Sequence, residues 1–149
     1  LVNKPFSKLT QSDWNAMYST HVFGPVALIK GLLPLLTRET TLPKSHIVNI
    51  SSMGGVQGST KFSGLSAYSS SKGALCTLTE CLAEEFQPLG IAVNALAIGS
   101  VETEMFRSAF PGFKAATDAD TMAEFMADFI LNGPALFNGK VLPVSNSTP

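Results

Sequence analysis

The sequence of 149 residues predicts an α/β fold in which a parallel β-sheet is covered by helices on both faces. Short β-branched runs alternate with longer stretches that have the apolar spacing of helices. Helical crossovers between successive strands imply right-handed βαβ units and therefore parallel strands. No internal repeat, low-complexity tract or interdomain linker interrupts this alternation, so we expect one domain over residues 1–149.

The first expected element is a long helix over residues 14–36. Ser12 and Asp13 precede it and offer an N-cap, because their side chains can accept hydrogen bonds from the first free backbone amides. The stretch 24–29, Gly-Pro-Val-Ala-Leu-Ile, is apolar nearly all round the helix. This indicates that other elements cover the helix on more than one side.

A strand is expected at residues 46–51, where a β-branched run ends in Ser-Ser-Met-Gly-Gly. A second helix is expected over residues 67–87, because Leu75, Leu78 and Leu82 are spaced three and four apart, and a Pro-Leu-Gly sequence ends it. The remaining expected elements, in chain order, are a strand at residues 91–97, short helices at about 102–110 and 120–131, and a last strand at 140–144.

Composition and charge exclude several classes of protein. The formal net charge is −1 and Lys and Arg do not cluster, so a nucleic-acid-binding protein is not expected. The most apolar run, residues 22–36, is interrupted by Pro25, Lys30 and Pro34, so no membrane span is expected. The first four residues lack the features of a signal peptide, and we expect a cytoplasmic protein. Apolar residues reach 45% and charged residues only 14%, which indicates a larger parent fold, a subunit interface, or both.

Neither a metal site nor a disulfide is expected. Cys76 and Cys81 are five residues apart in one expected helix, which turns the two thiols to different faces. His21 and His46 do not complete a set of ligands with metal-binding spacing. We therefore expect two reduced thiols, and we assign His46 a structural role.

The residues that carry chemistry are Tyr68 and Lys72, in the sequence Tyr-Ser-Ser-Ser-Lys at the start of the second expected helix. Four residues apart, they lie on one helical face. A nearby ammonium and the positive end of the helix favour the phenolate, so such a pair can exchange a proton near neutral pH. The competing interpretation is a surface tyrosine near a solvated lysine, and the bare pattern does not distinguish the two.

Two further motifs make the pattern specific. Ile-Val-Asn-Ile-Ser-Ser at residues 47–52 precedes the pair, and Val-Asn-Ala-Leu-Ala-Ile-Gly-Ser-Val-Glu-Thr at residues 93–103 follows it. With these motifs the chain resembles the short-chain dehydrogenase/reductase (SDR) family, from the helix that carries Trp14 to the final strand. The resemblance implies a Rossmann-like doubly wound parallel sheet, of which this chain holds roughly the last three strands. It also implies an NAD(P)-dependent oxidoreductase that moves hydride between nicotinamide and a carbonyl or alcohol.

The resemblance also implies roles for single residues. Tyr68 is the general acid/base at the substrate oxygen, Lys72 lowers its pKa and binds the nicotinamide ribose, and Ser52 orients the substrate oxygen. Asn94 supports the active-site loop, while Ser51 is expected to be structural. Each role has a structural competitor, such as a strand end for Ser52 and a tie between two loops for Asn94. The segment expected to meet the cofactor contains Gly99, Val101 and Thr103, of which Thr103 is alternatively a plain helix N-cap.

The sequence departs from the family pattern in four places. The glycine-rich turn, the cofactor selector and the strand after them do not appear, so we expect the C-terminal catalytic part of a larger domain, with NAD or NADP as cofactor. His21 stands where the family has an asparagine that holds a relay water. We expect His21 to act in that relay, and a histidine bonded to a backbone carbonyl is the alternative. Residues 58–64 contain about three extra residues that would line the substrate pocket, and Ile98 replaces a frequent proline.

The leading hypothesis is therefore an enzyme with a small-molecule carbonyl or alcohol substrate, which forms a homodimer or homotetramer in its full-length form. A non-catalytic SDR-fold binding protein and an inactive truncated fragment are the alternatives. Ser52, Tyr68 and Lys72 are all present, which favours the enzyme.

Overall fold

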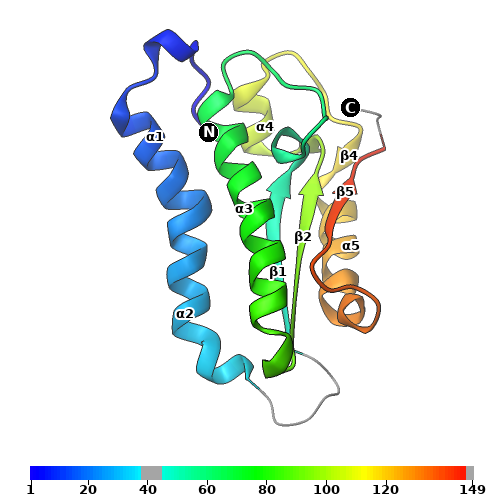
Figure 1. Cartoon of the computed structure of the whole chain (residues 1–149). Helices are drawn as coiled ribbons and strands as arrows, with labels where there is room; N and C mark the ends of the chain where they lie inside the picture. The colour runs from blue at the N-terminus through cyan, green and yellow to red at the C-terminus, as the bar shows by residue number, and fades with distance from the viewer. Residues whose placement is uncertain (38–44, 147–149) are drawn as a thin grey trace.

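The structure is a computed structural model that describes residues 1–37 and 45–146 (Figure 1). A parallel sheet lies between helices from the first 85 residues and a further long helix from the C-terminal part of the chain. The elements in chain order are α1 (Gln11–Tyr18), the π-helical η2 (Ser19–Phe23), α2 (Gly24–Leu36), β1 (Ser45–Ser52), α3 (Ser66–Glu85), β2 (Ile91–Ile98), β3 (Val101–Glu102), α4 (Glu104–Ala109), β4 (Thr117–Asp118), α5 (Ala119–Asn132) and β5 (Val141–Val144). Short 3₁₀ turns are η1 (Phe6–Lys8), η3 (Met53–Gly55), η4 (Gln87–Leu89) and η5 (Gly133–Ala135).

The main sheet is parallel, with strand order β1-β2-β5. β1 pairs with β2 from Ser45↔Ile91 to Ser52↔Ile98, so both strands end at the same edge of the sheet. The helices α1, α2 and α3 lie on one face and α5 lies on the other (Figure 1). The predicted α/β fold with parallel strands and helices on both faces is confirmed. The two-residue pair β3–β4 was not expected, because runs this short carry no periodicity.

The core lies along β2. Seven of its eight residues are buried, from Ile91 to Ala97, as is typical of a central parallel strand covered on both faces. A hydrophobic cluster joins this strand to the helices above it through Ile29, Ala83, Phe86, Ile91 and Val93. This packing holds α3 against the sheet and so positions the start of α3 beside the strand ends.

The first helical stretch begins one turn earlier than expected. Thr10, rather than Ser12 or Asp13, is the N-cap. Its hydroxyl accepts from the Asp13 backbone amide at 3.2 Å, and the Asp13 carboxylate accepts in return from the Thr10 backbone amide at 2.9 Å. This reciprocal capping box places Asp13 inside the helix, where its carboxylate faces the positive helix end.

The prolines do not interrupt this stretch. The π-helical turn Ser19–Phe23 ends with a bond from the Gly24 amide to the Ser19 carbonyl, and Pro25 enters where the backbone is already widened. Pro34 lies close to the end of α2. Gln11–Leu36 therefore forms 26 continuous helical residues with a mean hydropathy of 1.3 over its most apolar window. The expectation that no stretch reaches the length of a membrane span is wrong. Length and hydropathy alone are weak evidence that this helix spans a membrane, because core helices of soluble proteins and signal sequences have the same length and hydropathy.

One side of β1 has no neighbouring strand among the described residues, since β1 pairs with β2 alone. α2 runs above this side, and its leucines face outwards or towards a groove, with Leu28 63% exposed and Leu35 78% exposed. The groove between α2 and β1 has a volume of about 660 Å³. The fold therefore carries an open strand edge and an exposed apolar helix face on the same side.

Candidate active site

The candidate site lies at the carboxyl ends of β1 and β2, where the first turns of α3 meet them (Figure 1). Ser52 ends β1, and Tyr68 and Lys72 lie one turn apart in α3. The turn η3 packs closely against α3 between them. A Cβ added at Gly55 would lie 2.6 Å from the Lys72 carbonyl carbon, so glycine is needed for this approach.

The phenol of Tyr68 is largely buried, and burial raises its pKa above the ordinary value. A side-chain hydrogen bond with Ser52 acts in the opposite direction and lowers it. The Ser52 hydroxyl oxygen also accepts from the Gly54 backbone amide at 3.2 Å, which holds the side chain at the turn. Ser52 and Tyr68 are thus brought together, as the sequence predicted.

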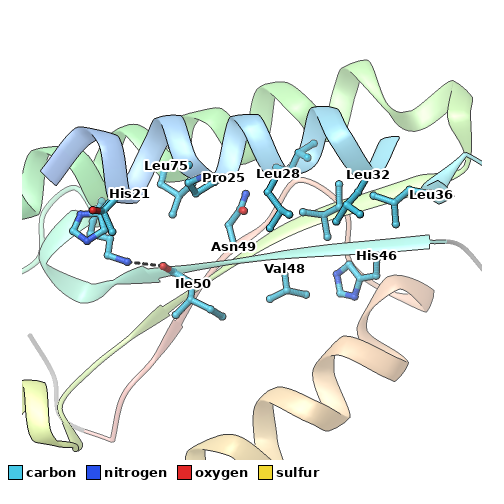
Figure 2. A pocket seen from close by; sticks show the side chains of 15 residues that line it. His21, Pro25, Leu28, Leu32, Leu36, His46, Val48, Asn49, Ile50 and Leu75 are labelled. Atoms are coloured by element: carbon cyan, nitrogen blue, oxygen red, sulfur yellow. Dashed lines mark hydrogen bonds between the residues drawn. The ribbon is translucent and has the colours of Figure 1, made fainter. Parts of the chain in front are cut away.

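The Lys72 ammonium is bonded to the backbone of β1. Its Nζ donates to the Ile50 carbonyl at 2.7 Å, the bond dashed in Figure 2. Nζ also lies 5.9 Å from the centroid of the Tyr68 ring. Burial lowers the pKa of Lys72. Burial is the larger of the two influences on the phenol, and the lowering of its pKa by Lys72 stays a prediction.

His21 lies beside the pair. It comes from the π-helical turn, its ring is perpendicular to that of Tyr68 at a centroid distance of 5.3 Å, and its Nδ1 is 2.8 Å from the Ser71 hydroxyl. Burial, and then the positive charge of Lys72, lower the pKa of His21 to about 4. The ring is therefore neutral at physiological pH, and its partner is a hydroxyl rather than the backbone carbonyl of the alternative interpretation. Its part in a relay stays a prediction.

Ser71 was not expected at the site. Its side chain is fully buried, and its hydroxyl bonds both His21 and the Tyr68 carbonyl. The signal in the sequence is its position three residues after Tyr68, which places it on the same helical face. Among three consecutive serines, this spacing alone distinguishes it.

His21 lies at one end of the apolar groove, and His46 and Leu36 lie at the other (Figure 2). Lys72, which also lines the groove, is bonded to the Ile50 carbonyl. The groove walls come from α2 and β1. The candidate site therefore continues into an apolar surface rather than into a closed pocket.

The residues expected to meet a cofactor all have structural contacts. A Cβ at Gly99 would lie 2.5 Å from the Ser145 hydroxyl, so this glycine permits the close approach of the residue that follows β5. Val101 is buried in the β3–β4 pair. The Thr103 hydroxyl accepts from the Phe106 amide at 3.2 Å and caps α4. Their cofactor contacts stay predictions.

Asn94 is fully buried in the middle of β2, away from the strand end. Its side chain donates to the Phe137 carbonyl at 3.0 Å and bonds the His46 Nε2 at 2.9 Å, and its oxygen accepts from the Lys140 amide. It ties the sheet to the segment before β5. The observed role matches the structural alternative, a tie between two segments, rather than support of the active-site loop.

Other polar residues near the site are structural. The Ser51 hydroxyl donates to the Lys72 carbonyl at 2.9 Å and contacts the thiol of Cys76. Cys76 is buried and Cys81 exposed, both as free thiols. In residues 1–37 and 45–146 no group of three or more His, Cys, Asp or Glu side chains could hold a metal ion.

The loop that carries the extra residues lies over the carboxyl end of β1. The Gly64 carbonyl accepts from the Lys4 amide at 3.0 Å, and the Phe62 ring meets the Phe110 ring edge-on at 5.8 Å. The loop thus joins the N-terminal segment to the region after α4. Its role in a substrate pocket stays a prediction.

Known proteins resemble this chain in sequence and in fold. The model of the short chain dehydrogenase family matches residues 1–113. An uncharacterized oxidoreductase from Staphylococcus saprophyticus is 30% identical over 135 residues, which cover 89% of this chain and 55% of that protein. The chain spans from about a quarter to about half the length of the curated relatives it matches.

Solved structures resemble the fold along nearly the whole chain. A putative short chain dehydrogenase from Escherichia coli, complexed with NADPH, has a TM-score of 0.79 and 25% identity, over 95% of this chain and 57% of that one. A 3-ketoacyl-(acyl-carrier-protein) reductase from Brucella melitensis, complexed with NADH, has a TM-score of 0.76 and 21% identity, over 95% and 60%.

Proposed function

The chain belongs to the short-chain dehydrogenase family, and from this membership we propose that it supplies the proton-transferring residues of an NAD(P)-dependent oxidoreductase. The reaction moves hydride between a nicotinamide cofactor and a carbonyl or alcohol. The observation that supports this most directly is the grouping of Ser52, Tyr68 and Lys72 where β1 ends against α3.

Tyr68 carries the proton in this proposal. Because burial raises its pKa, the phenol is protonated at neutral pH and can donate to a carbonyl oxygen during reduction. Ser52, which hydrogen-bonds the phenol, orients the same oxygen. In the oxidation of an alcohol, the phenol must first lose its proton, so this direction is favoured as the pH rises.

Lys72 fits the ribose end of a nicotinamide cofactor. Its ammonium has three donors and uses one on the Ile50 carbonyl, so two remain for hydroxyl groups at the mouth of the groove. When bound there, the cofactor would supply or accept the hydride, while the protein provides position and proton. We propose that the cofactor also contacts Gly99, Val101 and Thr103. Either NAD or NADP is compatible, since the residues of this chain do not select between them.

His21 completes the proposed site. With a pKa of about 4 it is neutral at physiological pH, and its ring lies against Tyr68. It can hold a water beside Lys72 through a hydrogen bond. This is the role in the proton relay that we expected from its position in the sequence.

The remaining parts of the proposal concern the whole protein. We propose a small-molecule substrate, a cytoplasmic location and a homodimer or homotetramer. The exposed leucines of α2 support a covered surface there.

The proposal is tested by titrating the complete gene product with NADH and NADPH, followed by fluorescence, and by measuring turnover of a panel of aldehydes, ketones and alcohols. Micromolar cofactor binding with turnover is the expected result. Binding without turnover of any substrate would favour the non-catalytic alternative. No binding and no turnover by a folded protein would favour an inactive fragment.

A further inference from the structure

The hydroxyl of Ser71 joins two parts of the candidate site. It lies 2.7 Å from the backbone carbonyl oxygen of Tyr68, in its own helix α3, and 2.8 Å from Nδ1 of His21, in the π-helical turn. Ser71 is fully buried, so water does not compete for these bonds. Every proton in this arrangement can therefore be assigned from the donors and acceptors present.

A serine hydroxyl has one proton and two lone pairs, whereas a carbonyl oxygen can only accept. At 2.7 Å, the bond to the Tyr68 carbonyl requires the Ser71 proton. The hydroxyl oxygen must then accept the second bond, so the proton between Ser71 and His21 belongs to Nδ1. In a neutral imidazole, protonation at Nδ1 leaves Nε2 with a lone pair.

We infer that Ser71 is a positioning residue that holds His21 as the neutral Nδ1–H tautomer, with Nε2 as a fixed hydrogen-bond acceptor at the Lys72 end of the groove. The catalytic meaning of this inference rests on the proposed function, whereas the tautomer itself does not. Nε2 has no hydrogen-bond partner within residues 1–37 and 45–146, so it is the nitrogen available to a water, cofactor or substrate donor.

This assignment excludes one role for His21. To pass a proton through its ring, His21 would have to release the Nδ1 proton to Ser71, whose own proton is already bound to the Tyr68 carbonyl. The positive charge of Lys72 and the burial of the ring also disfavour the doubly protonated form. His21 therefore accepts a hydrogen bond and does not carry protons.

The same hydroxyl fixes the orientation of the ring. The His21 ring stands edge-on to the Tyr68 ring, at an interplanar angle of 88°. Because Ser71 is anchored to the backbone of Tyr68 itself, its hydroxyl ties the His21 ring to the turn of α3 that carries Tyr68. Ser71 thus sets both the position and the protonation of His21.

The tautomer is measured in the complete gene product labelled with ¹⁵N-histidine, at neutral pH, through the long-range ¹H–¹⁵N couplings of the imidazole rings. The His21→Asn variant assigns the signals of His21. We expect a protonated Nδ1 and an unprotonated Nε2. A protonated Nε2 in the unaltered protein would overturn the inference without any variant at Ser71.

His46 provides an internal reference, since its Nδ1 lies 3.0 Å from the Ile130 carbonyl and its Nε2 accepts from Asn94. The Ser71→Ala variant should change the tautomer ratio of His21 and leave that of His46 unchanged. Ser70→Ala is the matched control, because that hydroxyl bonds only the Ala67 carbonyl, at 3.2 Å. An unchanged His21 tautomer in folded Ser71→Ala contradicts the inference.

Activity then separates this inference from the proposed function. We expect Ser71→Ala to lower kcat roughly tenfold with little change in KM, because a misplaced group acts on the chemical step. A changed tautomer with unchanged kcat would refute the positioning role and leave the oxidoreductase intact. The expected tautomer in a protein without dehydrogenase activity would refute the proposed function and leave the assignment of protons standing.

Discussion

The phenol of Tyr68 stands between two opposing influences, burial that raises its pKa and the Ser52 hydroxyl that lowers it. Lys72, one turn further along α3, is bonded to the Ile50 carbonyl, with its Nζ 5.9 Å from the centroid of the Tyr68 ring. A bound molecule that competes for the lysine would change this balance. The reactivity of the pair therefore depends on what binds beside it.

The first prediction concerns Tyr68. Tyr68→Phe should lower turnover by about 10²-fold or more and leave cofactor affinity nearly unchanged, because only the proton donor is removed. The measurement is kcat with a saturating cofactor, together with a fluorescence titration. Tyr18→Phe is the control, since Tyr18 contacts Trp14 in α1. Near-normal turnover of Tyr68→Phe would refute the mechanism.

The second prediction concerns His21. His21→Asn should keep most of the activity, because an asparagine amide can donate to Ser71 and still accept a hydrogen bond through its oxygen. His21→Leu should lose much more, since it leaves the Ser71 hydroxyl oxygen without its donor. Steady-state kinetics of both variants decide the matter. Equal activities would assign His21 to packing alone.

The third prediction is a loss of stability in weak acid. The pKa values of His21 and His46 lie below the ordinary 6.5 in the folded protein, so the unfolded chain binds more protons below this pH. Folding stability should therefore be complete above about pH 6.5 and decline towards pH 4. Denaturant unfolding at several pH values measures this. Asp13, with a carboxyl pKa of about 2, contributes only in stronger acid.

A control for this prediction is the variant His46→Asn, which should weaken the decline between these pH values. A free energy of unfolding that stays constant from about pH 7 to pH 5 would contradict the assignment of buried neutral rings.

The positions and contacts of the site residues could be predicted from the sequence only in part. The position of Tyr68 and Lys72 on one helical face was predictable, because they are four residues apart. The direction of the Lys72 ammonium was not, because it depends on the Ile50 carbonyl, which only the packing of β1 against α3 brings within reach. The contact between His21 and Ser71 spans fifty positions and has no local pattern.

At the scale of elements, the closest approach is that of η3 to α3. Gly55→Ala should destabilise the protein and lower activity, because the added Cβ meets the backbone at Lys72 and Gly73 within 3 Å. Gly31→Ala is the matched control. Its Cβ meets nothing within 4 Å in α2, so stability should rise by up to about 1 kcal/mol. Thermal unfolding and kcat of both variants are the measurements, and equal effects would contradict the close packing.

The elements themselves were predicted within a few residues, because their apolar spacing is local. The predicted N-cap of the first helix was wrong. Thr10 and Asp13 cap it as a reciprocal pair, which a search for single capping residues does not reveal. The π-helical turn and the pair β3–β4 were not foreseen, because both depend on contacts outside their own segments.

At the scale of the whole molecule, we expect residues 1–149 expressed alone to self-associate and to show no measurable binding of NAD or NADP. β1 presents a free edge among the described residues, and the leucines of α2 are exposed beside it. The sequence also lacks a glycine-rich turn for the pyrophosphate. Light scattering, thermal unfolding and NADH fluorescence test this. A monodisperse monomer with cooperative unfolding and micromolar cofactor affinity would contradict it.

The π-helical turn determines the rotational phase of the helix that contains it. Met17 in α1 and Ile29 in α2 are the buried residues of the two halves. Twelve residues of regular α-helix, at about 100° each, would leave them about 120° apart round the axis. The extra residue held by the wide turn removes about 100° of this offset. Regular helical spacing would place the buried residues of α1 and α2 on different faces. With the π-helical turn between them, both lie on the same buried side. A one-residue deletion within Ser19–Phe23 would leave eleven regular steps between Met17 and Ile29, about 20° apart round the axis, so Met17 should stay on the buried side.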